Sequence, residues 1–170
     1  KFGPTIVCDS DTIFCNELDS LPPPEFYDNC DPNPVMYFTG QDVEKFNCDP
    51  LYLKRVTRYY RAIDYNGASS TCAQVIMLKR IPLDSVVYPH NFNRRPYILA
   101  CNGNYPKDSD GHPSTDTTGV PTVHGFPIYP SSPYCNLSAD YEDTEILLSD
   151  CKKKVIRIWT VVDWNCVNPS

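Results

Sequence analysis

The sequence predicts an all-β chain that forms two tandem β-sandwiches. Two observations point to this class. The 170 residues include 17 prolines, and a proline inside a helix removes a backbone donor and clashes with the preceding turn. Valine, isoleucine, threonine and tyrosine, which favour strands, recur in short runs between polar connections. No segment carries apolar residues at a convincing helical spacing, so we expect strands joined by long irregular connections.

Nine cysteines are spread singly along the chain, without a C-x-x-C pair and without zinc-finger spacing to histidine. This distribution is typical of disulfide bonds, which persist in oxidising compartments. We therefore expect an extracellular or cell-surface protein. An odd number leaves at least one cysteine free or bonded to another chain. No signal peptide or transmembrane run is recognisable, so a mature or excised segment is expected.

The charge balance argues against some partners. The net charge is −6, whereas a nucleic-acid-binding protein needs clustered positive charge. The one basic run, Lys152–Lys154, fits a solvated strand edge. We expect neither nucleic-acid binding nor membrane insertion.

The chain is organised around two similar stretches, Cys48–Gly67 and Cys151–Cys166. In both, alternate residues run aliphatic, Arg, aromatic, aliphatic, Asp, and alternate residues of a strand share one face. The matched residues are Val56, Arg58, Tyr60, Ala62 and Asp64 in the first stretch and Val155, Arg157, Trp159, Val161 and Asp163 in the second. A strand-and-turn unit used twice is the natural interpretation. If the arginines are buried they need partners, either the aspartate on the same face or solvent at the sheet end.

Further elements follow in order. In the first unit, strands are expected at 1–7, 35–39, within 48–64 and at 70–79, with a turn at 65–67. In the second, they are expected at 97–100, 121–123, 145–148 and within 151–163. The junction at 81–91 divides the chain into sandwiches at 1–82 and 83–170, the second with a long loop at 102–133.

Three segments resemble a known family: RYYRAIDYNG at 58–67 followed by STCAQVI, DNCDPNP at 28–34, and RIWTVVDWNC at 157–166. They are similar to hyalin-type (HYR) and related immunoglobulin-like repeats, and to cysteine-rich repeats of secreted surface adhesins of gliding bacteria. The resemblance implies immunoglobulin-like sandwiches stapled by disulfides, in an extracellular adhesin or fibre without an active site. The sequence departs from it at Tyr65-Asn66, where such repeats often carry another cysteine.

Disulfide pairs are expected from equivalent positions in the two units. Cys30 and Cys48 match Cys135 and Cys151, so each pair is expected to bond. Two further disulfides are expected to join an early strand of each unit to a late one, namely Cys15 with Cys72 in the first unit and Cys101 with Cys166 in the second. Cys8 is left over, because its usual partner in the family pattern is the missing cysteine. It is expected to be free, locally paired or bonded to a neighbouring subunit.

The second unit ends four residues after Cys166, where the first unit continues into another strand. We expect its sheet to lack a final strand, either because the chain is cut from a longer protein or because a strand arrives from another copy. The N-terminal segment, with Phe2, Pro4, Ile6 and Val7, would be the donor and would build a head-to-tail filament. A plain adhesin repeat, a carbohydrate-binding module that meets surface glycans through tyrosines, and, more weakly, a secreted enzyme with its site in 102–133 are the alternatives.

Little in the sequence indicates chemistry. Catalytic motifs such as G-x-S-x-G and H-E-x-x-H are absent, and the expectation is a protein that is not an enzyme. No cofactor is expected; the alternative is calcium at Asp108, Asp110 and Asp116, whose spacing is not that of an EF-hand. The three histidines share no zinc spacing. Asn136 begins an accessible-looking glycosylation sequon, Asn-Leu-Ser.

Overall fold

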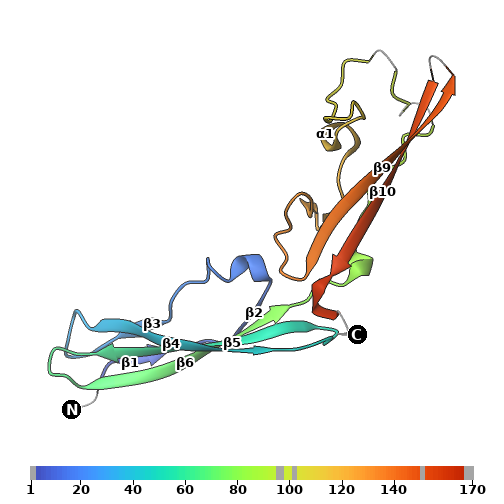
Figure 1. The fold of residues 1–170 in the computed structure, drawn as a ribbon. Coiled ribbons are helices and arrows are strands. Elements are labelled where there is room, and N and C mark those ends of the chain that lie inside the picture. Colours follow the sequence, from blue (N-terminus) through green and yellow to red (C-terminus); the bar gives the residue numbers. More distant parts are fainter. Residues whose placement is uncertain (1–2, 95–97, 101–102, 150–151, 167–170) are drawn as a thin grey trace. The chain divides into compact units, whose positions relative to one another are not determined.

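The computed structural model describes residues 3–94, 98–100, 103–149 and 152–166. These residues form mostly strands, with almost no helix (Figure 1). The all-β class is thereby confirmed. The chain divides into two compact units, Lys1–Arg80 with Asn165–Ser170 and Ile81–Trp164. Within the described part, no helix is long and apolar enough to cross a membrane.

Unit 1 is built on a four-stranded sheet with the order β2-β6-β5-β4. The strands are β2 (Asp11–Ile13), β6 (Ser69–Lys79), β5 (Tyr52–Ile63) and β4 (Val35–Lys45). The first of the two similar stretches forms β5, which lies at the centre and pairs antiparallel with both β4 and β6. The short β2 pairs parallel with β6.

A small core lies on one face of this sheet. Alternate residues are buried in the second half of β6, because successive side chains of a strand point to opposite faces. In β5 a register shift between Tyr52 and Lys54 brings Leu53 into the same core as Val56. The buried members of this core are Leu53, Val56, Ile76 and Leu78. The segment around β2 and the 3-10 helix η1 (Cys15–Glu17) packs against it with Ile13, Cys15, Leu18 and Leu21. A two-stranded ladder of β1 (Thr5–Val7) and β3 (Glu25–Tyr27) accompanies the sheet, with β1 lying against β5 and β6.

The turn predicted after β5 is present, and a second aspartate-rich loop is bonded to it. The Asp64 carboxylate accepts hydrogen bonds from the backbone N–H groups of Asn66 and Ala68, and Gly67 adopts a positive φ of 82°. Asp31, in the D-N-C-D-P-N-P segment, accepts a bond of 2.8 Å from the Tyr65 N–H. Two of the segments that carried the resemblance are therefore neighbours in the fold.

Unit 2 contains one long antiparallel hairpin, β9 (Leu137–Ser149) with β10 (Lys152–Asp163). The preceding segment holds η2 (Leu83–Ser85), α1 (Thr115–Thr118), β7 (Thr122–Val123) and β8 (Phe126–Pro127), and η3 (Trp164–Cys166) follows β10. Its buried apolar residues are Ile81, Pro121, Val123, Ile128, Tyr134 and Leu137. The division into two immunoglobulin-like sandwiches stays a prediction, because the described part of unit 2 contains only this hairpin and the two-residue β7–β8 ladder.

Three strand predictions need correction. The strand predicted at 35–39 continues to Lys45, because β5 pairs with it along that length. Residues 98–100 are not a strand, and Tyr97 lies outside the described residues. The strand predicted at 145–148 begins eight residues earlier, at Leu137. Its first half carries Asp140, Glu142 and Asp143, which disfavour strands by intrinsic propensity, and it forms because β10 supplies the pairing partner along its whole length.

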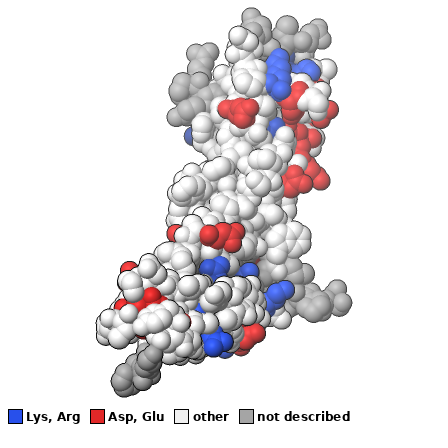
Figure 2. All heavy atoms as spheres, turned by 90° about the vertical axis from the view of Figure 1, so that its left-hand side faces the viewer, with Lys and Arg blue, Asp and Glu red and all other residues white. Residues whose placement is uncertain are grey.

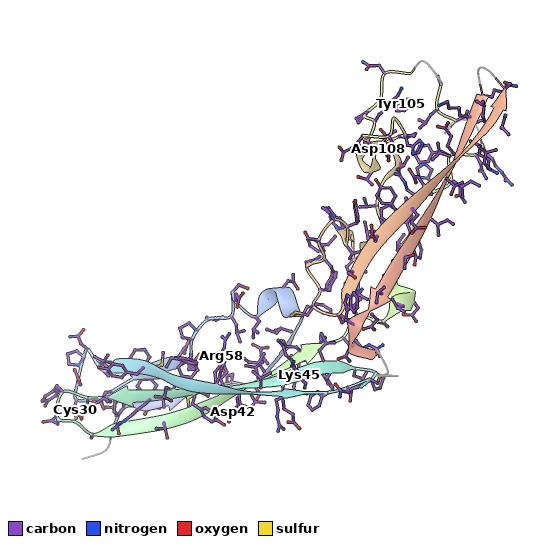
Figure 3. The ribbon with its side chains drawn as sticks, in the orientation of Figure 1. Cys30, Asp42, Lys45, Arg58, Tyr105 and Asp108 are labelled. Carbon is purple, nitrogen blue, oxygen red and sulfur yellow. A yellow bond between two sulfur atoms is a disulfide. The ribbon has the colours of Figure 1, made fainter. Side chains whose placement is uncertain are left out.

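The disulfide scheme also differs from the prediction. Cys8 bonds to Cys72, with their Cα atoms 5.9 Å apart, so both the pairing of Cys15 with Cys72 and the unpaired Cys8 are wrong. Cys30 is free and exposed, and its predicted bond to Cys48 is wrong too. The prediction from equivalent positions was wrong because the two cysteines are far apart in unit 1. Cys30 lies at one end of the unit (Figure 3), in the loop that the Asp28 carboxylate caps, whereas Cys48 follows β4.

The other cysteines divide into two groups. Cys15, Cys48 and Cys135 are each in a disulfide, as expected. Cys101 and Cys151, and the side chain of Cys166, lie outside the described residues.

Candidate functional site

The polar centre of unit 2 is Arg157, on the face of β10 that the preceding loop covers. Arg157 lies directly opposite Asp143 in the β9–β10 register. Its Nε and Nη2 atoms donate to the two oxygens of Asp143 at 2.8 and 2.6 Å. Only 11% of the Arg157 side chain and 8% of the Asp143 side chain are exposed. The predicted partner on the same strand, Asp163, is therefore not the one the fold uses.

Arg157 also holds the loop against the hairpin. Its Nη1 donates to the Thr118 hydroxyl at 2.8 Å and its Nη2 to the Pro113 carbonyl at 2.9 Å. The hydrogen bond to Asp143 raises the pKa of the guanidinium above its ordinary value, so the side chain stays charged. One residue thus links two strands and the loop that contains α1.

Beside this pair, His112 lies between carboxylates. Its Nδ1 is 3.5 Å from Asp143 Oδ2, and its Nε2 is 3.4 Å from Glu145 Oε2. Asp108 Oδ2 lies 3.8 Å from Arg157 Nη2, and the other oxygen of Asp108 accepts the backbone N–H groups of Asp110 and His112. Figure 3 places Asp108 in the loop beside the hairpin.

Aromatic rings lie next to Arg157 on the same face of the β9–β10 hairpin. Tyr141 and Trp159, opposite each other in the register, lie 5.0 Å apart between ring centroids. Tyr129, from the loop, contacts both edge-on, and the Arg157 guanidinium lies 4.1 Å above the Tyr141 ring. Burial raises the pKa of the Tyr141 phenol. The cluster anchors the loop by aromatic packing and a cation–π contact.

A pocket of about 340 Å³ opens onto these groups. Four aspartates, His112 and two tyrosines are among its lining residues, namely Asp108, Asp110, Asp140, Asp143, His112, Tyr129 and Tyr141. Acidic side chains are also prominent on the face of unit 2 shown in Figure 2. The pocket is therefore polar and negatively charged, with aromatic walls.

The predicted calcium residues are only partly brought together. Asp108 and Asp110 share the pocket, but Asp116 is exposed on α1 and does not line it. The groups that do converge are Asp108, His112 and Asp143, with one ligand atom of each within 4.8 Å of the others. Spacing in the sequence could not reveal this set, because Asp143 comes from β9, a strand that the sequence did not predict at that position.

The second notable feature is the outer edge of β10. In unit 1, β5 is paired on both sides, and its residues Val56, Tyr60 and Ala62 are buried. In unit 2, β9 occupies the place of β4, but no described strand occupies the place of β6. The matching residues Val155, Trp159 and Val161 are only half-buried.

The predicted donor segment is engaged in its own unit. Thr5–Val7 forms β1, in which Ile6 lies opposite Phe26 of β3, and Pro4 is buried. Gly3 approaches the backbone of Ser69 so closely that an added Cβ would meet it at 2.9 Å. Phe2 lies outside the described residues.

The glycosylation expectation at Asn136 is not supported by its surroundings. Asn136 is 3% exposed. Its Nδ2, the atom to which a glycan would be attached, donates to the Ile81 carbonyl at 2.9 Å, and its Oδ1 accepts from the Ile81 N–H at 3.4 Å. The sequon is therefore a buried structural element and not an accessible turn.

No protein-family model matches the chain, and neither a curated protein nor a solved structure matches it. The resemblance to hyalin-type repeats accordingly stays an expectation from the sequence.

Proposed function

We propose that the chain is a structural subunit of an extracellular fibre or surface adhesin, and that a strand from a neighbouring subunit adds to the edge of β10. The observation that carries the proposal is the contrast between β5 and β10. The two strands share one residue pattern, but β5 has a partner on each side, whereas β10 pairs only with β9 among the described strands.

The exposed surface of the hairpin supports the same conclusion. A two-stranded hairpin is marginally stable without a further layer or strand. On the outer face of β10, Ile156 is half-buried and Ile158 is 61% exposed. An added strand would satisfy the free backbone groups of the edge and cover part of this apolar row.

The donor we propose is the N-terminal segment of the next subunit, transferred by exchange. β1 is held to β3 by only three residue pairs, whereas β10 offers an edge of twelve residues. The disulfide at Cys8 tethers the segment, and the seven residues before it can extend about 23 Å at roughly 3.3 Å per residue. Release would cost the burial of Pro4, which the longer pairing on β10 has to outweigh.

The test combines an acceptor variant and a donor variant. Ile158→Lys places a charge on the exposed face of the edge strand, which should prevent pairing without disturbing the fold. Thr144→Lys, on the same face but on β9, is the matched control. We expect sedimentation and electron microscopy to show concentration-dependent filaments for wild type and Thr144→Lys only. Deletion of residues 1–7 should also abolish assembly.

Three outcomes would contradict the proposal, each in a different part: the assembly, the acceptor strand or the donor segment. A wild-type chain that stays monomeric at every concentration would refute assembly. Filaments formed equally by Ile158→Lys would exclude the β10 edge as acceptor. Filaments formed by the deletion variant would exclude the N-terminal segment as donor while leaving the acceptor in place.

Carbohydrate binding is the second candidate, because the polar pocket has the required composition. Tyr129 and Tyr141 offer aromatic faces for the apolar face of a sugar ring, and the four aspartates offer acceptors for hydroxyl groups. Binding to a glycan array that is lost in Tyr129→Ala would favour this function. An array without any bound glycan would exclude it for the sugars present.

A further inference from the structure

We propose that Asp108, His112 and Asp143 form a binding site for a divalent transition-metal ion, of which zinc is the probe of choice. This inference does not depend on the assembly proposed above. One ligand atom from each residue lies within 4.8 Å of the other two. An imidazole nitrogen with two carboxylate oxygens is a donor set that zinc accepts, at bond lengths of about 2.0–2.2 Å.

The geometry needs only a small contraction. Neighbouring ligand atoms on a tetrahedral zinc ion lie about 3.3–3.5 Å apart, as follows from these bond lengths. His112 Nδ1 and Asp143 Oδ2 are already 3.5 Å apart. The third ligand, Asp108, keeps one oxygen in the hydrogen bonds of its own turn and has the other, Oδ2, directed toward the Arg157–Asp143 pair.

His112 supplies a second and independent observation. Its Nδ1 is completely buried and no hydrogen bond reaches it, although unpaired buried polar atoms are costly. Its Nε2 faces Glu145 at 3.4 Å. Metal-bound histidines characteristically direct one ring nitrogen to the metal and the other to a carboxylate. The ring is thus oriented as a ligand, with Nδ1, which makes no hydrogen bond, 3.5 Å from Asp143 Oδ2.

Arg157 would position the carboxylate ligand. It contacts both oxygens of Asp143 from β10 and fixes the carboxylate plane, as the outer hydrogen-bond partners of metal ligands do. The surroundings still favour added positive charge. Five carboxylates gather here (Asp108, Asp110, Asp140, Asp143 and Glu145), while the cations that pair with them among the described residues are Arg157 and Lys153.

The metal would join the loop to the hairpin. Asp108 and His112 belong to the loop before α1, and Asp143 belongs to β9. Zinc is expected in preference to calcium, because calcium takes six to eight oxygen ligands and does not favour a nitrogen donor. Binding would therefore stabilise unit 2 by restraining its longest connection.

The test is calorimetric titration of the whole chain with zinc chloride, after alkylation of the exposed Cys30 so that its thiol cannot bind the ion. We expect one zinc ion per chain, and binding at least tenfold weaker in His112→Gln and in Asp108→Asn. The asparagine variant can still accept the two backbone hydrogen bonds of the turn, so its loop should remain folded. His90→Gln, an exposed histidine in the same unit, is the matched control and should bind as wild type.

Cobalt(II) absorbance provides a second measurement, which a purely structural role of His112 would leave unchanged. Cobalt(II) bound to a mixed nitrogen and oxygen site should give a visible absorption band that zinc abolishes, and His112→Gln should remove the band. Absence of stoichiometric zinc binding would overturn the proposal. So would equal binding by wild type and His112→Gln, or displacement of the ion by millimolar calcium.

Discussion

The Arg157–Asp143 pair allows the sharpest test of how unit 2 is held together. Arg157→Met keeps a long side chain but removes the charge and every donor. It leaves Asp143, 8% exposed, as a buried carboxylate without its partner. Breaking one side of a buried ion pair costs about 3–5 kcal/mol. The additional bonds to Thr118 and Pro113 place the expected loss in the upper half of that range.

The chain provides its own probe for this measurement. Both tryptophans, Trp159 and Trp164, belong to unit 2, so tryptophan fluorescence follows the unfolding of that unit. For a domain of this size each kcal/mol shifts the melting temperature by about 4–8 °C. We expect Arg157→Met, at about 4–5 kcal/mol, to lower the transition by at least about 16 °C.

Two further variants separate the charge effect from loss of contact area. Arg94→Met, an exposed arginine in the same unit, should melt within a few degrees of wild type. Arg157→Met combined with Asp143→Asn should regain part of the loss, because no charge is then left unpaired. A single variant destabilised by less than about 1 kcal/mol, the upper end of what exposed pairs usually contribute, would refute the reasoning. A double variant no more stable than the single one would refute the charge argument in particular.

Three more predictions concern other parts of the chain. Cys30 should react with a maleimide in the native protein, whereas Cys72 should react only after reduction. Mass spectrometry of the peptides would locate the label, and labelling of Cys72 without reduction would contradict the pairing. Asn136→Ala should destabilise unit 2 by about 1–3 kcal/mol in tryptophan-monitored denaturation, because both backbone groups of Ile81 lose their partner; an unchanged midpoint would show that water replaces the amide. Backbone N–H groups of Leu51 and Tyr52 lower the pKa of Asp49 below 3.8, so its stabilising effect should be present above that pH and disappear as the pH falls through the lower, folded-state value. Asp49→Asn should therefore reduce stability to urea, followed by circular dichroism, by more at pH 6 than at pH 2, and an equal difference at both would contradict the assignment.

The sequence was informative where the controlling interactions are local. The alternation in β5 and β10 predicted both strands and their shared faces. The Asp64–Gly67 turn was predicted from Asn66 and Gly67, of which Gly67 adopts the positive φ. These features depend on neighbours within a few residues, so they can be read without the fold.

It was misleading where the controlling partner is distant. Arg157 was matched with an aspartate on its own strand, but the fold pairs it with Asp143 across the hairpin. The acidic first half of β9 has poor strand propensity and becomes a strand through its pairing with β10. Disulfide partners cannot be deduced from order alone, and the bond between Cys8 and Cys72 depends on β1 lying against β6.

That bond spans a sequence separation of 64 residues and has a consequence for the order of events during synthesis. β2 pairs with β6, the last strand of unit 1, and Cys8 forms its disulfide with Cys72 of the same strand. The pairing of β2 and the bond of Cys8 therefore form only after almost all of residues 1–80 have left the ribosome, whereas β1 can pair with β3 earlier. Closing a ring of this length is worth about 4 kcal/mol in the chain-entropy model. Unit 1 thus completes its sheet late in its synthesis, once β6 is available to pair.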